Sequence, residues 1–293
     1  MITEIQCNDW KAGFEPQTST YATHELENGK VLLLPQLHFA LLPHEERYLS
    51  EDFADPASKN ISYHSAKDSL GGVRGNLQDK MIHKAFLQRF NLYATSLIEQ
   101  LFPRYQPHLH IARTSFRPVE IEGRPVPSFR KDDTRLHVDA FPSSPNQGKR
   151  ILRVFTNIHP HGKARHWRLG EPFEIVAQQF LPTVKKPWPG RGALLKALKL
   201  TKSYCTEYDY TMLQIHNNMK ADTHYQKNAS QKEALFMPGQ TWIVQTDHVS
   251  HAAMAGQHVL EQTFYLPVEA MANPELSPLK TLERLVGKSL VRQ

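Results

Sequence analysis

The sequence predicts an α+β protein in which a sandwich or barrel of about eight strands carries helices on its outside. Three observations predict it: a long helical pattern at 76–102, a series of short apolar runs between 109 and 268, and a second helical pattern near the C-terminus. The length of 293 residues fits one large domain or two small ones. We expect one domain, with a mainly helical part at 1–105, a β core at 106–270 and a closing helix at 271–293.

The clearest helix is predicted in the N-terminal part. Residues 1–75 are mixed, with short apolar runs that proline and glycine interrupt, and "SLGGVRGN" at 69–76 is typical of an exposed loop. Beyond it, apolar residues recur at spacings of three and four, which indicates one amphipathic helix that ends before Pro103. These apolar residues are Ile82, Phe86, Phe90, Tyr93, Leu97 and Leu101.

After residue 105 the pattern changes to short, often alternating runs separated by Pro, Gly, Asn and Asp. Such runs are typical of strands that have one buried face. We expect strands within 109–121, 134–141, 150–158, 173–181, 210–219, 232–237, 240–247 and 258–268.

The tail "SPLKTLERLVGKSL" predicts a final helix. Ser277 is suited to cap its N-terminus, Pro278 to occupy its first position, and the leucines fall on one face. This helix should close the domain.

Composition excludes several classes of protein. The start "MITEIQCNDW" carries an early acid and no long apolar run, so it is no secretory signal, and we expect a cytoplasmic protein. The most apolar stretch, 31–43, contains Pro35 and is shorter than the roughly 20 residues that span a bilayer. Two cysteines are too few for a disulfide framework or a cysteine metal site. The formal charge of +6 suggests an anionic partner.

Histidine and carboxylate must therefore supply any metal site. In "RLHVDAF", His137 and Asp139 are two residues apart on a predicted strand end, so their side chains leave on the same side. A third ligand from "TDHVSHAAMAGQH" would complete the two-histidine, one-carboxylate face found in non-haem Fe(II) oxygenases. Either His248 or His251 could be that ligand.

Two stretches carry a resemblance to a known family. "FRKDDTRLHVDAFPSSPNQGKRILRVFTNIHP" and "TDHVSHAAMAGQHVLEQTFYLPVEAM" closely resemble the 3-deoxy-D-manno-oct-2-ulosonic acid (Kdo) hydroxylases of Gram-negative bacteria, and the likeness is densest at about 113–268. The resemblance implies a double-stranded β-helix (jelly-roll) core and an enzyme that depends on Fe(II) and 2-oxoglutarate. It also implies hydroxylation of carbon 3 of the Kdo sugar in lipid A precursors, which gives Ko. By similarity, His137, Asp139 and His251 bind the iron, and His248 is a polar turn residue.

The co-substrate 2-oxoglutarate needs a cation for the carboxylate that does not bind iron. Many dioxygenases of this fold place an arginine about ten residues after the distal histidine, but this chain has Glu261 and Gln262 there. Arg153 is the best substitute, because alternation in "RILRVFTNI" aims it inward with no acid at neighbouring inward positions. The alternative is an exterior salt bridge. Gln262 and Thr263 could add hydrogen bonds, and His258 is a further candidate.

The substrate also carries negative charge, since Kdo has a carboxylate and lipid A has phosphates. Candidate cations flank the metal motif on its N-terminal side, although each could equally be a solvated surface cation. They are Arg113, Arg117, Arg130, Lys131 and Arg135.

One segment is strongly basic. Between Glu174 and Glu207 there is no acid, while six cations at 185–202 alternate with Trp188 and leucines. "GALLKALKL" would form a short basic amphipathic helix suited to an anionic membrane surface, or an ordinary surface helix. We therefore expect an enzyme that takes molecular oxygen and a Kdo–lipid A type glycolipid, peripheral at the inner membrane.

Two other functions fit the same features less well. The first is a dioxygenase of this fold that acts on another sugar or small metabolite. The second is a non-catalytic module that binds membranes through its basic helix. We do not expect nucleic acid as a partner, because the basic residues gather in one segment and no binding motif is present.

Overall fold

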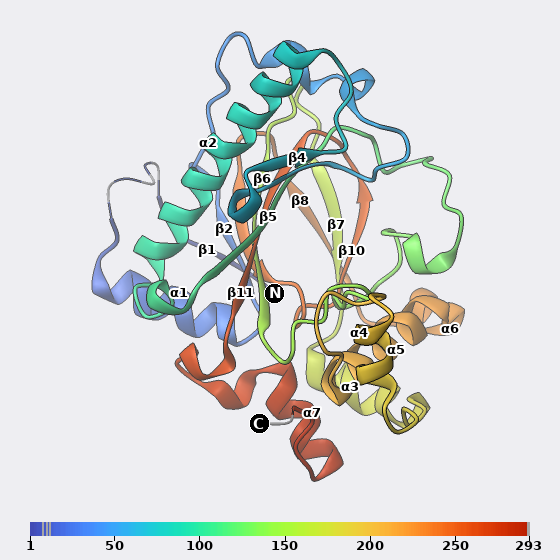
Figure 1. The fold of residues 1–293 in the computed structure, drawn as a ribbon. Helices are drawn as coiled ribbons and strands as arrows, with labels where there is room; N and C mark the ends of the chain where they lie inside the picture. The colour runs from blue at the N-terminus through green and yellow to red at the C-terminus, as the bar shows by residue number, and fades with distance from the viewer. Residues whose placement is uncertain (8, 10, 12, 292–293) are drawn as a thin grey trace.

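The computed structural model describes residues 1–293 apart from 8, 10, 12, 292 and 293. Its centre is a large sheet and a small one (Figure 1). The large sheet has the order β1-β2-β9-β6-β11-β5-β3-β4, and all of its pairs except β1 with β2 are antiparallel. Its strands are β1 (Ile2–Glu4), β2 (Val31–Leu34), β3 (Ile61–His64), β4 (Ser69–Gly71), β5 (His110–Arg117), β6 (Arg150–Asn157), β9 (Thr241–Gln245) and β11 (Val259–Leu266).

The small sheet is antiparallel and packs its inner face on the large sheet. It has the order β10-β7-β8, with β7 at Arg165–Leu169, β8 at Lys232–Phe236 and β10 at His251–Ala255. Trp167 of β7 meets Phe155 of β6 edge to face at 5.2 Å, and Phe236 of β8 stacks on Trp242 of β9 at 4.1 Å. These buried aromatic rings fill one end of the space between the sheets.

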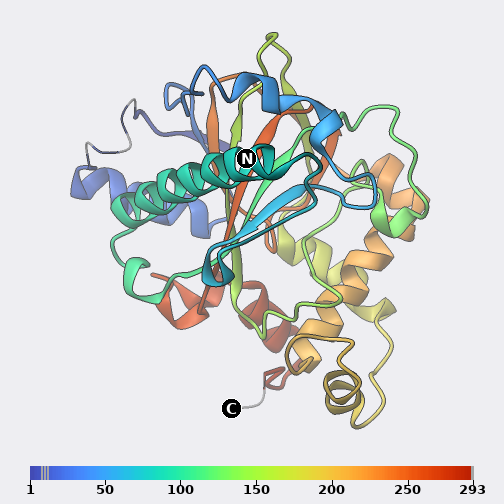
Figure 2. The same cartoon turned by 45° about the horizontal axis from the view of Figure 1, so that its top comes forward.

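Helices cover the other face of the large sheet. α1 (Pro16–Glu27) lies against β2, and α2 (Leu77–Leu101) crosses β5, β3 and β11 (Figures 1 and 2). The predicted helix at 76–102 is thus confirmed, and a capping box between Asn76 and Asp79 begins it. Phe86 of α2 packs on Phe116 of β5 with ring centroids 5.7 Å apart.

Two predicted strands are wrong, because their burial follows helical spacing. Residues 173–181 form α3 (Phe173–Phe180), whose buried residues include Phe173, Val176 and Phe180. Residues 210–219 lie within α5 (Glu207–Ala221), which begins at a capping box between Thr206 and Asp209. The apolar runs there are amphipathic at the helical period of 3.6, which the strand interpretation overlooked.

Two more differences concern the candidate metal motif and its neighbour. Residues 134–141 form no strand and have only a bridge between His137 and His251. Conversely, β7 at Arg165–Leu169 was not expected, since "RHWRL" has only two apolar residues and its buried face includes Arg165. Strands were found within the other five predicted runs after residue 105.

The ends of the chain join the central architecture. β1, β2, β3 and β4 all belong to the large sheet, so the sheet draws on both sides of the expected boundary at 105. α7 (Pro278–Val286) confirms the predicted final helix, and Ser277 Oγ accepts a hydrogen bond from Lys280 N at 3.2 Å. The remaining helices are α4 (Arg191–Ala197) and α6 (Thr223–Asn228). Across the described part of the chain, every helix is too short or too polar to cross a membrane.

One ion pair is completely enclosed in the protein interior. Arg150 of β6 and Asp247, just after β9, are both fully buried, and Arg150 Nε lies 2.8 Å from Asp247 Oδ2. Burying a charge is tolerated only when a partner offsets the loss of water. The pair therefore fixes the turn that leads from β9 to β10.

We expect Asp247→Ala to lower the free energy of unfolding by about 3–5 kcal/mol, because it leaves Arg150 buried without a partner. The double variant Arg150→Met/Asp247→Leu should lose much less. Urea denaturation of both variants measures the difference. Equal losses would mean that the lost contacts, and not the unpaired charge, determine the cost.

Candidate metal centre and its pocket

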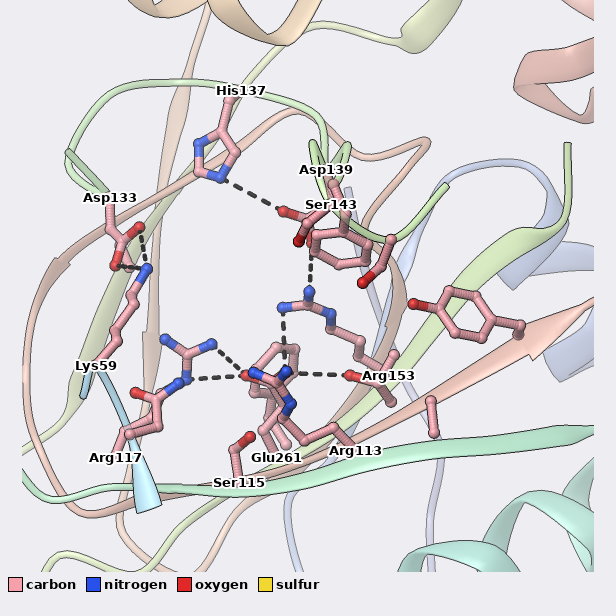
Figure 3. Close-up of a pocket in the computed structure, with 18 of the residues that line it drawn as sticks. Lys59, Arg113, Ser115, Arg117, Asp133, His137, Asp139, Ser143, Arg153 and Glu261 are labelled. Atoms are coloured by element: carbon pink, nitrogen blue, oxygen red, sulfur yellow. Dashed lines mark hydrogen bonds and ion pairs between the residues drawn. The ribbon is translucent and has the colours of Figure 1, made fainter. Parts of the chain in front are cut away.

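The backbone brings the two metal-motif segments together. His137 N donates to His251 O at 3.0 Å, His251 N donates to His137 O at 2.9 Å, and Asp139 N donates to Thr246 O at 2.8 Å. As a result, one potential ligand atom from each of His137, Asp139 and His251 lies within 4.8 Å of the others. All three side chains are buried, and Figure 3 shows the His137 ring pointing toward the Asp139 carboxylate.

Hydrogen bonds orient both imidazoles. His137 Nδ1 lies 2.7 Å from Arg135 O, and His251 Nδ1 lies 2.8 Å from Val249 O. A carbonyl can only accept, so each Nδ1 carries the proton and each Nε2 keeps a lone pair for a metal. Burial lowers the pKa of both histidines, which keeps them neutral as metal ligands must be.

Asp139 stays ionised because of a cation beside it. Burial alone would raise the pKa of Asp139, but Arg153, together with His251 and Thr246, holds the pKa below its usual range. Arg153 Nη2 lies 3.0 Å from Asp139 Oδ2. The other carboxylate oxygen, Asp139 Oδ1, lies 3.7 Å from His137 Nε2 and is the oxygen available to a metal.

This donor set fits divalent iron. Two neutral imidazole nitrogens and one carboxylate on the same side are the ligands of non-haem Fe(II) oxygenases. Neighbouring aromatic rings pack on both imidazoles. The ring of Trp167 stacks on His251 at 5.1 Å, and His216 meets His137 edge to face at 5.0 Å.

The geometry also separates the two candidates for the third ligand. His248 lies beside Gly29 and faces Phe173 of α3, with ring centroids 6.0 Å apart, away from His137 and Asp139. His251 is the histidine that completes the cluster.

The cluster lines a cavity of about 530 Å³ between the sheets. Its walls come from β3, β5, β6, β7, β10 and β11 and from the loops at 141–145 and 202–203. Six cations face three carboxylates, so with neutral histidines the lining carries a net charge of +3. The cations are Lys59, Arg113, Arg117, Arg153, Arg165 and Lys202, and the carboxylates are Asp133, Asp139 and Glu261.

A chain of charges crosses this cavity (Figure 3). Arg153 Nη1 lies 3.3 Å from Glu261 Oε1, while Arg117 Nε donates to Glu261 Oε2 at 2.9 Å. Burial would raise the pKa of Glu261, but Arg117 and Arg153 together lower it to about 2. Arg153 was expected to have no acid at neighbouring inward positions of its strand. The structure places it between Asp139 and Glu261, which come from other segments, at the metal end of the cavity.

Some of the other predicted contacts line the cavity and some do not. Arg113, Arg117 and Thr263 line it. Gln262 does not, because neighbours on a strand point to opposite faces: its Oε1 accepts from Asn91 Nδ2 of α2 at 2.9 Å. His258 lies outside the lining and packs on His159, with ring centroids 4.9 Å apart.

The three cations nearest to the metal motif in sequence also lie outside the cavity. Arg135 donates through Nη1 to Lys220 O at 2.7 Å, and Arg130 and Lys131 are exposed on the preceding turn. These residues are close to the metal motif in sequence but not in space, because the chain turns at 129–131 before it reaches the motif.

Several lining residues were not identified from the sequence. Lys59 and His64 come from the N-terminal part, and Arg165 and Trp167 come from the unexpected strand β7. The inward alternation of "RHWRL" was the available signal for the last two.

Comparisons with known proteins agree with this geometry. A family model described as 3-deoxy-D-manno-oct-2-ulosonic acid (Kdo) hydroxylase matches residues 9–289. Among solved structures, the Kdo hydroxylase KdoO in complex with cobalt(II) is 47% identical, with a TM-score of 0.97 over 100% of this chain and 98% of that chain. KdoO in complex with alphaketoglutarate and Fe(III) is also 47% identical, with a TM-score of 0.95 over 99% and 97%.

Both structures describe KdoO as a non-heme Fe(II) alphaketoglutarate-dependent dioxygenase. No curated protein matches. The predicted jelly-roll fold and the resemblance read from the two metal-motif stretches are confirmed. This chain belongs to the Kdo hydroxylase family.

Proposed function

We propose that this protein is an Fe(II)- and 2-oxoglutarate-dependent dioxygenase that hydroxylates carbon 3 of Kdo in lipid A precursors to form Ko. The observation that carries the proposal is a buried His137–Asp139–His251 cluster on the wall of a cationic cavity, in a chain of this family. KdoO, at 47% identity over nearly the whole chain, was solved with alphaketoglutarate and iron and, separately, with succinate and iron.

His137, Asp139 and His251 would hold the iron. When bound, iron and 2-oxoglutarate activate dioxygen, so that one oxygen atom enters the sugar and the other enters succinate, with release of carbon dioxide. The chain positions these reactants: carbonyls fix both imidazoles, Arg153 holds Asp139, and Trp167 supports His251 and helps exclude water from the cavity.

The rim of the cavity is suited to an acidic sugar. Arg113 of β5 and Lys202 are exposed there, and neither has a carboxylate partner among the described residues. His64 and Tyr265 lie beside them on β3 and β11. The Kdo carboxylate would bind at this cationic rim while the ring of the sugar reaches toward the metal.

The basic segment at 185–202 adjoins the same rim. Lys202 N donates to Ser143 O at 3.0 Å, and Ser203 Oγ donates to Pro145 O at 3.2 Å. Apolar side chains in the segment are exposed: Trp188 53%, Leu194 45%, Leu198 59% and Leu200 59%. We propose that this segment rests on the anionic inner face of the membrane and brings the cavity to its lipid-anchored substrate, which makes the protein cytoplasmic and peripheral.

A dioxygenase that acts on another sugar is the second candidate. The observation that favours this candidate is the cavity volume of about 530 Å³, in which several acidic sugars would fit beside 2-oxoglutarate. Mass spectrometry of the product from a Kdo–lipid A acceptor, with a search for an added oxygen on Kdo, decides between the two.

We expect His137→Ala, Asp139→Ala and His251→Ala each to lower turnover by at least about 100-fold. Replacing a residue that only hydrogen-bonds a metal ligand costs about 10- to 100-fold in activity, and removing the ligand itself should cost more. His248→Ala is the matched control and should keep its metal and most of its activity. Iron content and succinate formation measure the four variants. An inactive His248→Ala protein beside an active His251→Ala protein would contradict the assignment.

We expect Arg153→Met to raise the concentration of 2-oxoglutarate that half-saturates the enzyme by at least about tenfold. The variant would lose a charge-assisted contact between Arg153 and 2-oxoglutarate next to the iron, and such a loss costs roughly 1.5–3 kcal/mol. Succinate formation at varied 2-oxoglutarate measures it. A variant with unchanged half-saturation would assign Arg153 to a purely structural ion pair.

We expect Lys196→Gln/Lys199→Gln to weaken binding to anionic liposomes by about tenfold or more, since each cation near such a surface contributes about 1 kcal/mol. Both lysines are exposed and lie outside the cavity. Sedimentation at low and physiological salt measures it. Lys80→Gln/Lys227→Gln removes the same charge elsewhere and is the control, so equal binding by both double variants would contradict membrane docking through this segment.

A further inference from the structure

A second pocket adjoins the catalytic cavity. It has a volume of about 330 Å³ and lies between the start of α4, the start of α5 and residues 289–290. Its walls combine three aromatic rings, those of Trp188, Tyr204 and Tyr210, with the guanidinium of Arg191. An aromatic face packs on the C–H face of a sugar ring, and a guanidinium matches the geometry of a phosphate. The pocket therefore has the chemistry that a phosphorylated sugar requires.

Arg191 has no counter-ion in this pocket. Its guanidinium carbon lies 4.6 Å from the centroid of the Tyr210 ring, and Nη1 lies 3.6 Å from Cys205 Sγ. Burial raises the pKa of Cys205, so its sulfur stays a neutral thiol. Glu207, the carboxylate in the lining, is already paired, since its Oε1 lies 2.6 Å from Lys288 Nζ. Throughout the described chain, no carboxylate lies within 4.0 Å of Arg191, which is thus oriented but free to bind an anion.

The backbone around the pocket is fixed before any ligand binds. A Cβ at Gly192 would lie 2.3 Å from Cys205 O, so the start of α4 touches the segment before α5 at a position where only glycine fits. Gln147 Nε2 donates to Tyr204 O at 3.1 Å. Two prolines restrict the loop that carries Trp188. The rings and the guanidinium are therefore held in place by the fold.

One short segment connects the pocket with the catalytic cavity. Lys202 and Ser203 line the cavity, and Tyr204, Cys205 and Thr206 line the pocket. At roughly 3.3–3.6 Å per residue of extended chain, Lys202 and Thr206 are at most about 14 Å apart. A glycan of a few sugars spans that distance. An acceptor whose Kdo ring lies in the cavity can thus place a neighbouring sugar in the pocket.

We propose that this pocket is a second substrate subsite, in which Arg191 binds a phosphate on a sugar next to the Kdo of the acceptor and the aromatic rings hold that sugar. The inference rests on the proposed function and adds recognition of the acceptor beyond the sugar that is hydroxylated. It is separate from membrane docking, because Lys196 and Lys199 lie outside the pocket.

A water-soluble acceptor tests the subsite without a membrane. The probe is a de-acylated Kdo–lipid A glycan, used both with its phosphates and after their removal. Arg191→Gln should raise the KM for the phosphorylated glycan by at least about tenfold and leave kcat unchanged. Removing the phosphates should raise the KM of the parent by a similar factor. The two losses should not add, because both remove the same contact.

Two further variants control for charge and folding. Arg191→Lys keeps the charge without the planar fork and should recover part of the affinity. Lys227→Gln is the matched control, since Lys227 is an exposed cation on α6 outside both the cavity and the pocket. It should have the KM of the parent for both glycans.

An unchanged KM of Arg191→Gln for the phosphorylated glycan, or an equal rise for both glycans, would overturn the subsite. Weaker binding of Arg191→Gln to anionic liposomes, with neither KM changed, would assign the pocket to a membrane phospholipid and overturn it as well. A parent protein that acts on both glycans with the same KM would overturn the subsite alone. A parent that hydroxylates neither glycan would overturn the proposed function itself.

Discussion

The whole site depends on a backbone bridge between two segments that are far apart in the chain. His137 and His251 exchange hydrogen bonds, and Asp139 N–H binds Thr246 O close by. Three side chains converge only because these contacts fix both the separation and the rotation of the segments. The small sheet holds β10 in place through β7, and the aromatic rings between the sheets hold β7 in turn. A change in that packing would act on the metal ligands directly.

Paired charges make the interior of the cavity possible. Guanidinium and carboxylate groups alternate from Asp139 through Arg153 and Glu261 to Arg117, so each of these four charges has an opposite neighbour. Glu261 occupies the region where many enzymes of this fold have an arginine, and here it organises two arginines that come from β5 and β6. The strand arginines that line this cavity therefore come from β5, β6 and β7 and not from β11.

The sequence was informative where one period dominates. The α2 pattern, the capped final helix and the alternation in β6, β9 and β11 all predicted the correct elements. Residues 173–181 and 210–219 were mistaken for strands because short apolar runs fit both periods, and length with capping residues distinguishes them. Gln262 and Thr263 could not both face the cavity, since adjacent strand residues point apart. Lys59 depended on tertiary pairing that no local pattern contains, whereas the alternation in "RHWRL" could have placed Arg165.

Arg165 is buried without a carboxylate partner among the described residues, and its charge therefore affects stability. Because its pKa is lowered, the folded chain holds that proton less firmly than the unfolded chain, so at neutral pH, below about 9, the charged side chain destabilises the fold. A carboxylate bound there would remove this cost, and a ligand that binds only the folded state stabilises it further. Arg150 provides the contrast, because it has a permanent partner in Asp247 and contributes only to the fold.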